Sequence, residues 1–166
     1  MHLSIADVKY MEGLLPKNYG HDAVEIPGAR KLLDKIVETK APWAIVTSGT
    51  TPLVSGWLDV MKLPQPEHLV TAESVENGKP DPTCYLMGRD KLKLTANDNI
   101  LVFEDSPAGI LSGKAAGCKV LGLVTSHTFQ QVKDAEPDWI VKDLESVRVV
   151  SVSEQGVELE FTDLLA

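Results

Sequence analysis

The stretch from Asn99 to Gly109, with the sequence NILVFEDSPAG, constrains the fold of this chain more than any other part of it. Its apolar run from Ile100 to Phe103 is typical of a buried strand in a parallel sheet. Glu104 and Asp105 follow where that strand ends, and a serine and a proline then start a helix. Because open α/β sheets bind ligands at the carboxyl ends of their strands, this stretch predicts two carboxylates at a ligand-binding edge.

Two adjacent carboxylates repel each other unless a cation lies between or beside them. Oxygen ligands favour a hard cation, so the pair Glu104 and Asp105 predicts a Mg²⁺ site. A simpler interpretation stays open, in which Glu104 only ends the strand and Asp105 only caps the next helix.

A second polar turn follows the apolar segment that begins at Trp43. The segment ends in Thr47, Ser48 and Gly49, and a helix with apolar residues on one face comes directly after it. Backbone N–H groups at such a turn, together with the two hydroxyl groups, predict a cradle for an anion. The alternative is an ordinary loop between a strand and a capped helix.

A third feature is a lysine between two rigid turns. Lys79 follows the Asn77-Gly78 turn and precedes Pro80, and Asp81-Pro82 starts the next helix. A lysine held in this way can be aimed at a phosphoryl group, whose charge it would neutralise. Most lysines in longer loops are merely solvated, and that remains the alternative.

The rest of the chain alternates between strand and helix patterns, which predicts an α/β fold with a right-handed, doubly wound parallel sheet. A weak amphipathic helix with nothing evident to pack on is expected at 3–15, followed by a turn-rich linker at 16–28. The last segment alternates in hydrophobicity and predicts a β-hairpin on the edge or flank of the sheet. The other expected helices are 29–37, 53–61, 82–92, 106–116 and 128–135, and the other strands are 43–46, 68–71, 100–103, 119–124 and 139–141.

Composition excludes several classes of protein. The chain has 166 residues, enough for one core, and 24 acidic against 16 basic residues give a net charge of −8, which argues against nucleic acid as a partner. Two distant cysteines, Cys84 and Cys118, are typical of reduced thiols. There is neither a signal-peptide pattern nor an apolar run long enough to cross a membrane. These features predict a cytoplasmic protein that does not associate with a membrane.

The three polar turns, in this order, resemble motifs II, III and IV of the haloacid dehalogenase (HAD) superfamily of phosphohydrolases. The segments WAIVTSGT, NGKPDP and VFEDSPAGI with GKAAGC resemble most closely the fungal branch that contains DL-glycerol-3-phosphatase and 2-deoxyglucose-6-phosphate phosphatase. The resemblance implies a HAD-like Rossmannoid parallel sheet flanked by helices. It also implies a Mg²⁺-dependent phosphatase of small phosphorylated polyols or sugars, with glycerol phosphate preferred.

The resemblance assigns roles to the three turns. Thr47 and the Ser48 and Gly49 amides would hold the transferring phosphoryl group, and Lys79 would neutralise its charge. Thr47 and Lys79 are thus the expected catalytic residues. Asp105 would bind Mg²⁺, with Glu104 at or near the metal.

One departure from the family pattern is large. Members attack phosphate with the first Asp of an Asp-x-Asp-Gly-Thr motif on a central strand, and this sequence contains no Asp-x-Asp. We expect the first strand, between the strands of Val46 and Val102, and most of the helical cap to be missing. On this interpretation 1–15 is a remnant of the cap, 16–28 is its hinge, and 29–166 is the HAD-like core with the C-terminal hairpin.

The missing motif leaves the function open between two classes. The chain is either an incomplete phosphatase, expected to be inactive alone, or a non-catalytic phosphate- and Mg²⁺-binding remnant or truncated gene product. The coding sequence ahead of Met1 would distinguish them. A receiver-like role, with Asp105 itself phosphorylated, is a weaker alternative, because receivers group further acidic residues on their first strand. A vacant position in the sheet would also favour self-association.

Overall fold

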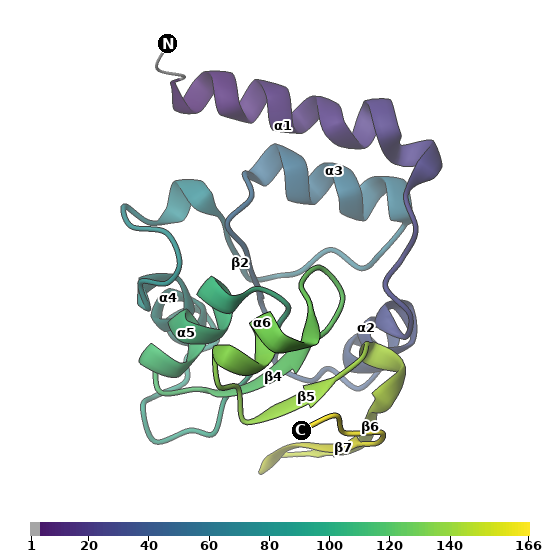
Figure 1. The fold of residues 1–166 in the computed structure, drawn as a ribbon, viewed down its shortest axis with the longest axis vertical. Coiled ribbons are helices and arrows are strands. Elements are labelled where there is room, and N and C mark those ends of the chain that lie inside the picture. Colours follow the sequence, from purple (N-terminus) through teal and green to yellow (C-terminus); the bar gives the residue numbers. More distant parts are fainter. Residues whose placement is uncertain (1–3) are drawn as a thin grey trace.

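The computed structural model describes residues 4–166, so Leu3, where the first helix was predicted to begin, lies outside the described residues. Helices and strands alternate through most of the chain, as the sequence predicted (Figure 1). The elements are α1 (Ile5–Tyr19), η1 (Gly20–Asp22), α2 (Ala29–Glu38), β1 (Ile45–Val46), α3 (Thr51–Met61), β2 (Leu69–Val70), η2 (Ala72–Ser74), α4 (Thr83–Lys91), β3 (Leu101–Glu104), α5 (Pro107–Ala115), β4 (Lys119–Leu123), α6 (Phe129–Asp134), β5 (Trp139–Val141), η3 (Leu144–Ser146), β6 (Val147–Ser153) and β7 (Gly156–Phe161).

The parallel strands form two separate pieces rather than one sheet. β1 pairs with β2, and β4 lies between β3 and β5. Within residues 4–166, no strand hydrogen-bonds to both β1 and β3. The Lys119 N–H donates to the Ile100 carbonyl, so the alternate residues Leu101 and Phe103 direct their backbone groups to the other edge of β3. The sheet is thus divided at the place where the family resemblance implies a further strand.

The core confirms an α/β fold with both sheet faces covered. Successive residues of β4 point to opposite faces, and Val120 packs with Ile110 and Val132 from the helices α5 and α6. Leu121, on the other face, belongs to a second cluster with Leu32 of α2 and the hairpin strands. Burial on both faces explains why β4 is apolar along nearly its whole length.

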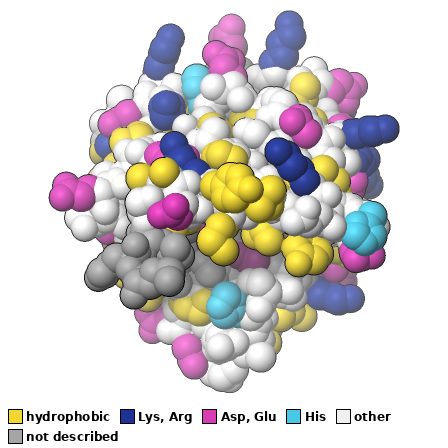
Figure 2. Space-filling view, turned by 90° about the horizontal axis from the view of Figure 1, so that it is seen from above, with side chains coloured by type: hydrophobic (Ala, Val, Ile, Leu, Met, Phe, Trp, Pro, Cys, Tyr) yellow, Lys and Arg dark blue, Asp and Glu magenta, His cyan; other side chains and the backbone are white. Residues whose placement is uncertain are grey.

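Helix α1 is longer than predicted and is not isolated. It continues through Pro16, inside the expected linker, and ends at Tyr19. α1 lies along α3 (Figure 1), and the buried Pro16 fits against Gly56, where a Cβ atom would lie only 2.8 Å from the proline ring. Its outer face remains apolar, and hydrophobic side chains gather near the centre of the face seen from above (Figure 2). The exposed apolar residues of α1 are Ile5, Tyr10, Met11, Leu15 and Tyr19.

The C-terminal segment forms the predicted hairpin. β6 and β7 pair antiparallel as a separate two-stranded sheet that packs with α2 on one flank of the core. Cys84 and Cys118 are buried and free, as expected for thiols that are not linked. Within the described part of the chain, none of the helices combines the length and the apolar character that crossing a bilayer requires.

Candidate active site

The three predicted turns meet at one cavity of about 300 Å³ at the carboxyl ends of β1 and β3. Five of the six predicted site residues line it, and the sixth, Gly49, lies next to Ser48 in the same turn. The lining residues are Val46, Thr47, Ser48, Lys79, Phe103, Glu104, Asp105 and Ser106. Side chains separated by up to 60 positions in the sequence, from Val46 to Ser106, are therefore brought to one place by the parallel strands.

Lys79 lies on the inner wall of this cavity and is fully engaged. Its side chain is 10% exposed and forms an ion pair with Glu104, which is 7% exposed. The same ammonium group donates to the Val46 carbonyl oxygen at 3.2 Å and to the Tyr85 hydroxyl oxygen at 3.1 Å. These three acceptors match the three protons of the ammonium group. Lys79 therefore lies at the cavity, as predicted, but it also makes three contacts within the protein that the sequence did not reveal.

Tyr85 is the residue of this cluster that sequence reasoning missed. It lies in the first turn of α4, its hydroxyl group donates to Glu104, and its ring centroid is 4.8 Å from the Lys79 nitrogen. Burial, and then the negative charge of Glu104, raise the pKa of Tyr85 far above its usual value, so it stays protonated. A side chain in a first helical turn leans back toward the preceding loop, and this geometry was the one signal available.

Glu104 turns inward beneath the start of α5. Its second oxygen accepts from the backbone N–H of Asp105 at 3.2 Å and of Ser106 at 3.3 Å, and from the Ser106 hydroxyl at 3.1 Å. Gly109 makes room for it, since a Cβ atom there would lie 2.0 Å from the carboxylate carbon. Both oxygens therefore accept hydrogen bonds, and direct metal binding by Glu104, as the sequence predicted, would require these contacts to be broken.

Asp105 turns the other way. Its Oδ2 atom accepts a hydrogen bond from the Thr125 hydroxyl at 3.2 Å, and its backbone carbonyl accepts one from the Ser126 hydroxyl at 3.4 Å. Within residues 4–166, its Oδ1 atom accepts no hydrogen bond. Of the two predicted metal ligands, Asp105 is the one with an oxygen available.

The predicted anion cradle is narrower than a whole helix N-terminus. Carboxylates already cap the first backbone N–H groups at the start of α3. The N–H of Thr50 donates to Glu12 at 2.8 Å, and the N–H of Thr51 donates to Glu73 at 3.2 Å. Burial raises the pKa of Glu73, but hydrogen bonds from a threonine hydroxyl, from backbone N–H groups and from Lys9 outweigh it and lower the pKa to about 2. These two carboxylates restrict an anion to the turn itself.

Within that turn, the Gly49 N–H donates to the Thr47 hydroxyl oxygen at 3.1 Å. Among the described residues, the Ser48 N–H has no acceptor, and Ser48 is exposed. The donors left for an anion are thus the Ser48 N–H and the hydroxyl protons of Thr47 and Ser48.

The oxygen atoms in this cavity suit Mg²⁺, which takes only some of its ligands from the protein, better than a metal ion that is held by protein side chains alone. Among residues 4–166, no three His, Cys, Asp or Glu side chains cluster closely enough to hold a metal. Mg²⁺ is commonly held by one or two carboxylates together with phosphate oxygens and water. Asp105 with one available oxygen, beside a turn that offers anion donors, meets that description.

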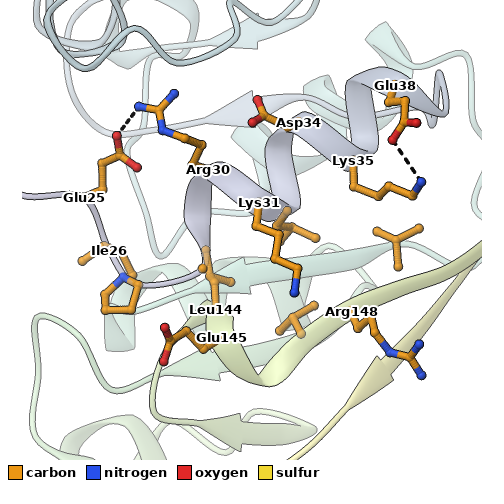
Figure 3. A pocket seen from close by; sticks show the side chains of 15 residues that line it. Glu25, Ile26, Arg30, Lys31, Asp34, Lys35, Glu38, Leu144, Glu145 and Arg148 are labelled. Atoms are coloured by element: carbon orange, nitrogen blue, oxygen red, sulfur yellow. Dashed lines mark hydrogen bonds and ion pairs between the residues drawn. The ribbon is translucent and has the colours of Figure 1, made fainter.

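A second, larger cavity of about 880 Å³ lies between α2 and the hairpin (Figure 3). Four of its eight charged side chains pair with each other, Arg30 with Glu25 and Lys35 with Glu38. None of the residues predicted for the site lines it. Size alone favours this cavity, but the smaller one gathers the groups that perform chemistry, so the smaller one is the candidate active site.

Comparison with known proteins agrees with this geometry. A family model described as haloacid dehalogenase-like hydrolase matches residues 9–123, which is more than half of the chain. The chain belongs to this family. The matched range contains all three turns, so the family resemblance drawn from them is confirmed.

Curated relatives within the haloacid dehalogenase-like hydrolases include phosphatases. The chain is 41% identical to glycerol-1-phosphate phosphohydrolase 1 of Saccharomyces cerevisiae, over 96% of this chain and 69% of that protein. It is 36% identical to 2-deoxyglucose-6-phosphate phosphatase 2 of the same yeast, over 93% and 70%. It is 41% identical to hexitol phosphatase A of Escherichia coli, over 75% and 56%. The chain thus spans between about half and about two thirds of the length of these relatives.

Solved structures show the same fold. A hydrolase from Pseudomonas syringae superposes with a TM-score of 0.72 over 87% of this chain and 68% of that one, at 22% identity. CbbY from Rhodobacter sphaeroides, solved with phosphate, superposes with a TM-score of 0.72 over 87% and 66%, at 18% identity. At these identities, the superpositions show the haloacid dehalogenase-like fold alone.

Proposed function

We propose that this chain carries the phosphate- and Mg²⁺-handling part of a phosphatase that acts on small phosphorylated polyols or sugars, with glycerol phosphate preferred. The observation that supports this most is the meeting of Thr47, Lys79 and Asp105 at one cavity. The names of the yeast and E. coli relatives support the substrate class.

The residues divide the work of binding a phosphoryl group. Thr47 and Ser48 donate hydrogen bonds to its oxygens, Lys79 offsets their charge, and Asp105 holds Mg²⁺ through its available oxygen. When bound, Mg²⁺ stabilises negative charge on the phosphoryl oxygens. Glu104 and Tyr85 take no part in binding and instead hold Lys79 in place through their hydrogen bonds.

Lys79 must exchange one contact to reach a phosphoryl oxygen, because all three of its protons are engaged. The contact with the Val46 carbonyl is the one to exchange, since the bonds to Glu104 and Tyr85 belong to the buried cluster. An anion in the cavity would then take the place of this carbonyl oxygen.

Hydrolysis by the family's covalent route needs an attacking carboxylate. The sequence contains no Asp-x-Asp. Neither carboxylate of the acidic pair replaces it, because Glu104 accepts hydrogen bonds at both oxygens and Asp105 is assigned to Mg²⁺. We therefore propose that the 166-residue chain binds phosphate together with Mg²⁺ but does not release phosphate from a monoester by itself.

Two measurements on the purified chain test this proposal. Incubation with glycerol 3-phosphate or 2-deoxyglucose 6-phosphate and Mg²⁺ should release no phosphate above the buffer blank. Calorimetric titration with inorganic phosphate in the presence of Mg²⁺ should detect binding that Lys79→Met weakens and Asp105→Asn removes, while the exposed control variants Lys91→Met and Asp34→Asn leave it unchanged. Phosphate release that disappears in Asp105→Asn would refute the inactivity, and absence of phosphate binding would refute the site.

A further inference from the structure

We propose that Asn77 is a site of spontaneous deamidation, and that the isoaspartate formed there displaces Lys79 from the phosphate site. The second half rests on the proposed function, because it concerns the lysine that would offset the charge of a phosphoryl group. The first half is a property of the loop that carries Asn77, and it holds whether or not the chain binds phosphate.

Deamidation is a reaction between an asparagine side chain and the backbone of the next residue. The backbone nitrogen loses its proton to the solvent and attacks the Cγ atom of the asparagine. The new C–N bond closes a cyclic imide, and the side-chain nitrogen takes up a proton and leaves as ammonia. Water then opens the imide at one of its two carbonyl carbons and gives either aspartate or isoaspartate. In isoaspartate the main chain runs through Cβ and Cγ, so it is longer by one methylene group.

The surroundings of Asn77 favour this ring closure. Asn77 and Gly78 are both exposed, in the loop between η2 and α4. Among the described residues, neither the Gly78 N–H nor the Asn77 side chain has a hydrogen-bond partner. Glycine carries no side chain that could hinder the attack, and a Cβ atom built on Gly78 would meet no atom within 4 Å. The nitrogen, the target carbon and the space for the ring are thus all available.

The other asparagines of the chain lack this combination. Asn97 is exposed as well, but the N–H of the next residue, Asp98, donates to the Thr95 carbonyl at 3.2 Å. Asn99 precedes a β-branched residue, and Asn18 lies within helix α1. Asn97 is therefore a control inside the same molecule, because it shares the exposure of Asn77 but not the free backbone nitrogen.

The link that contains Asn77 is short and is anchored at both ends. Val75 packs against the buried core, and Lys79 makes its three contacts at the wall of the cavity. Only three residues lie between them. The last of these, Gly78, closes a turn by accepting a hydrogen bond from the Asp81 N–H at 3.1 Å. An extra methylene group in so short a link has to shift one of its ends.

The longer main chain has a larger effect on the site than the new charge. Both products place a carboxylate at position 77, but that position is exposed, so solvent and salt screen the charge. The methylene group of isoaspartate instead enters the main chain directly before the turn that holds Lys79. We expect isoaspartate, and not aspartate, to prevent Lys79 from reaching a phosphoryl oxygen.

The first test measures the modification itself. The purified 166-residue chain is kept at mildly alkaline pH, digested at acidic pH and mapped by mass spectrometry, and isoaspartate is identified with an isoaspartyl methyltransferase. Asn77 should convert to aspartate and isoaspartate while Asn97 stays unmodified. Gly78→Ala should slow the conversion at Asn77, since its methyl group hinders the attack but meets no other part of the fold.

The second test measures binding of inorganic phosphate in the presence of Mg²⁺ by calorimetry. Aged wild type should lose binding sites in step with its fraction of isoaspartate. Asn77→Gln, whose longer side chain closes a ring slowly, should keep its sites through the same treatment. Freshly prepared Asn77→Asp should bind phosphate as the fresh wild type does, which separates charge from chain length. Treatment of the aged protein with the methyltransferase and S-adenosylmethionine, which returns isoaspartate to aspartate, should restore the lost sites.

The outcomes distinguish this inference from the proposed function. Equal conversion of Asn77 and Asn97 overturns the first half. Fresh wild type that binds no phosphate overturns the proposed function and the second half, whereas selective conversion of Asn77 would still establish the first. Fresh wild type that binds phosphate and keeps all its sites after conversion overturns only the role of isoaspartate. An equal loss of sites in aged Asn77→Gln also overturns that role, because the damage would then lie elsewhere in the chain.

Discussion

Glu104 and Asp105 are neighbours in the sequence, yet they have opposite surroundings. Glu104 is 7% exposed and accepts hydrogen bonds from Lys79, Tyr85, Ser106 and two backbone N–H groups. Asp105 is only partly buried, and one of its oxygens accepts a single hydrogen bond from Thr125. One carboxylate therefore stabilises the fold, and the other remains available to a ligand.

The difference follows from the geometry of a strand end. Successive side chains of a strand point in opposite directions, so two adjacent carboxylates rarely point into the same space. Glu104, the last residue of β3, points under α5, while Asp105 is the first residue beyond the strand. The acidic pair at the end of β3 thus consists of one carboxylate that accepts hydrogen bonds at both oxygens and one that accepts a single side-chain hydrogen bond from the described residues.

Removal of the two carboxylates should break this comparison most clearly. Glu104→Ala leaves the buried Lys79 ammonium without its counter-charge, and we expect the free energy of unfolding to fall by about 3–5 kcal/mol. Asp105→Ala loses one partly exposed hydrogen bond and should cost about 1 kcal/mol. Urea unfolding followed by circular dichroism measures both values. Equal losses in the two variants would contradict the division of roles.

A methyl group at Gly109 should displace Glu104 without removing its charge. Alanine in a helix is normally more stable than glycine by up to about 1 kcal/mol. At Gly109 the added Cβ atom would lie 2.0 Å from the Glu104 carboxylate carbon, so we expect Gly109→Ala to destabilise the protein by about 2 kcal/mol instead.

Gly78→Ala is the matched control, because no atom lies within 4 Å of the added Cβ atom there. Its free energy of unfolding should stay within about 0.5 kcal/mol of the wild type. A stabilising Gly109→Ala would show that the Glu104 carboxylate does not occupy the space beneath α5.

The Tyr85 hydroxyl tests how much one donor adds to the Glu104 cluster. Tyr85→Phe keeps the ring next to Lys79 but removes the hydrogen bond, and the expected loss is about 1 kcal/mol at neutral pH. Tyr10→Phe, at a tyrosine that is 70% exposed, is the control and should change little.

The difference in stability between the wild type and Tyr85→Phe should depend on pH, and the raised pKa of Tyr85 fixes the sign of that dependence. The pKa of Tyr85 is raised in the folded protein above the ordinary value of 10.0, so the unfolded chain loses the proton first. The contribution of Tyr85 to stability is complete below pH 10 and is lost as the pH rises above it. The advantage of the wild type over Tyr85→Phe should therefore shrink between pH 10 and 11, and an advantage that grows there would exclude the raised pKa.

The three turns were predictable from the sequence because each is a local pattern. Ser106 caps α5 by accepting from the Gly109 N–H, as the order of residues after Asp105 predicted, and Lys79 lies between its two turns as expected. Parallel strands then bring such turns to one edge by topology alone. For these reasons, the fold and the cavity followed from short stretches.

The contacts that assign roles within the cavity were not predictable in this way. These contacts join residues that are 19 to 38 positions apart in the sequence, and no periodic pattern marks them. They are made by Tyr85 with Glu104, by Thr125 with Asp105 and by Glu12 with Thr50. The helix α1 was predicted to lack a packing partner for the same reason, since its contact with α3 connects distant segments. Which of two adjacent carboxylates faces inward depends on these neighbours.

The smallest expected effect is the stabilisation of the chain by Mg²⁺, and it separates the two carboxylates without reference to their effects on folding. A ligand that binds only the folded state stabilises it by RT ln(1 + [L]/Kd), which is about 0.4 kcal/mol when the Mg²⁺ concentration equals Kd. Thermal unfolding with and without Mg²⁺ should show this increment in the wild type and, although the fold is weaker, also in Glu104→Gln. Asp105→Asn should lose the increment while its melting temperature without Mg²⁺ stays close to that of the wild type, because, of these two carboxylates, Asp105 is the one with an oxygen that accepts no hydrogen bond from residues 4–166. If Glu104→Gln loses the increment and Asp105→Asn keeps it, the two carboxylates have exchanged roles and the comparison fails.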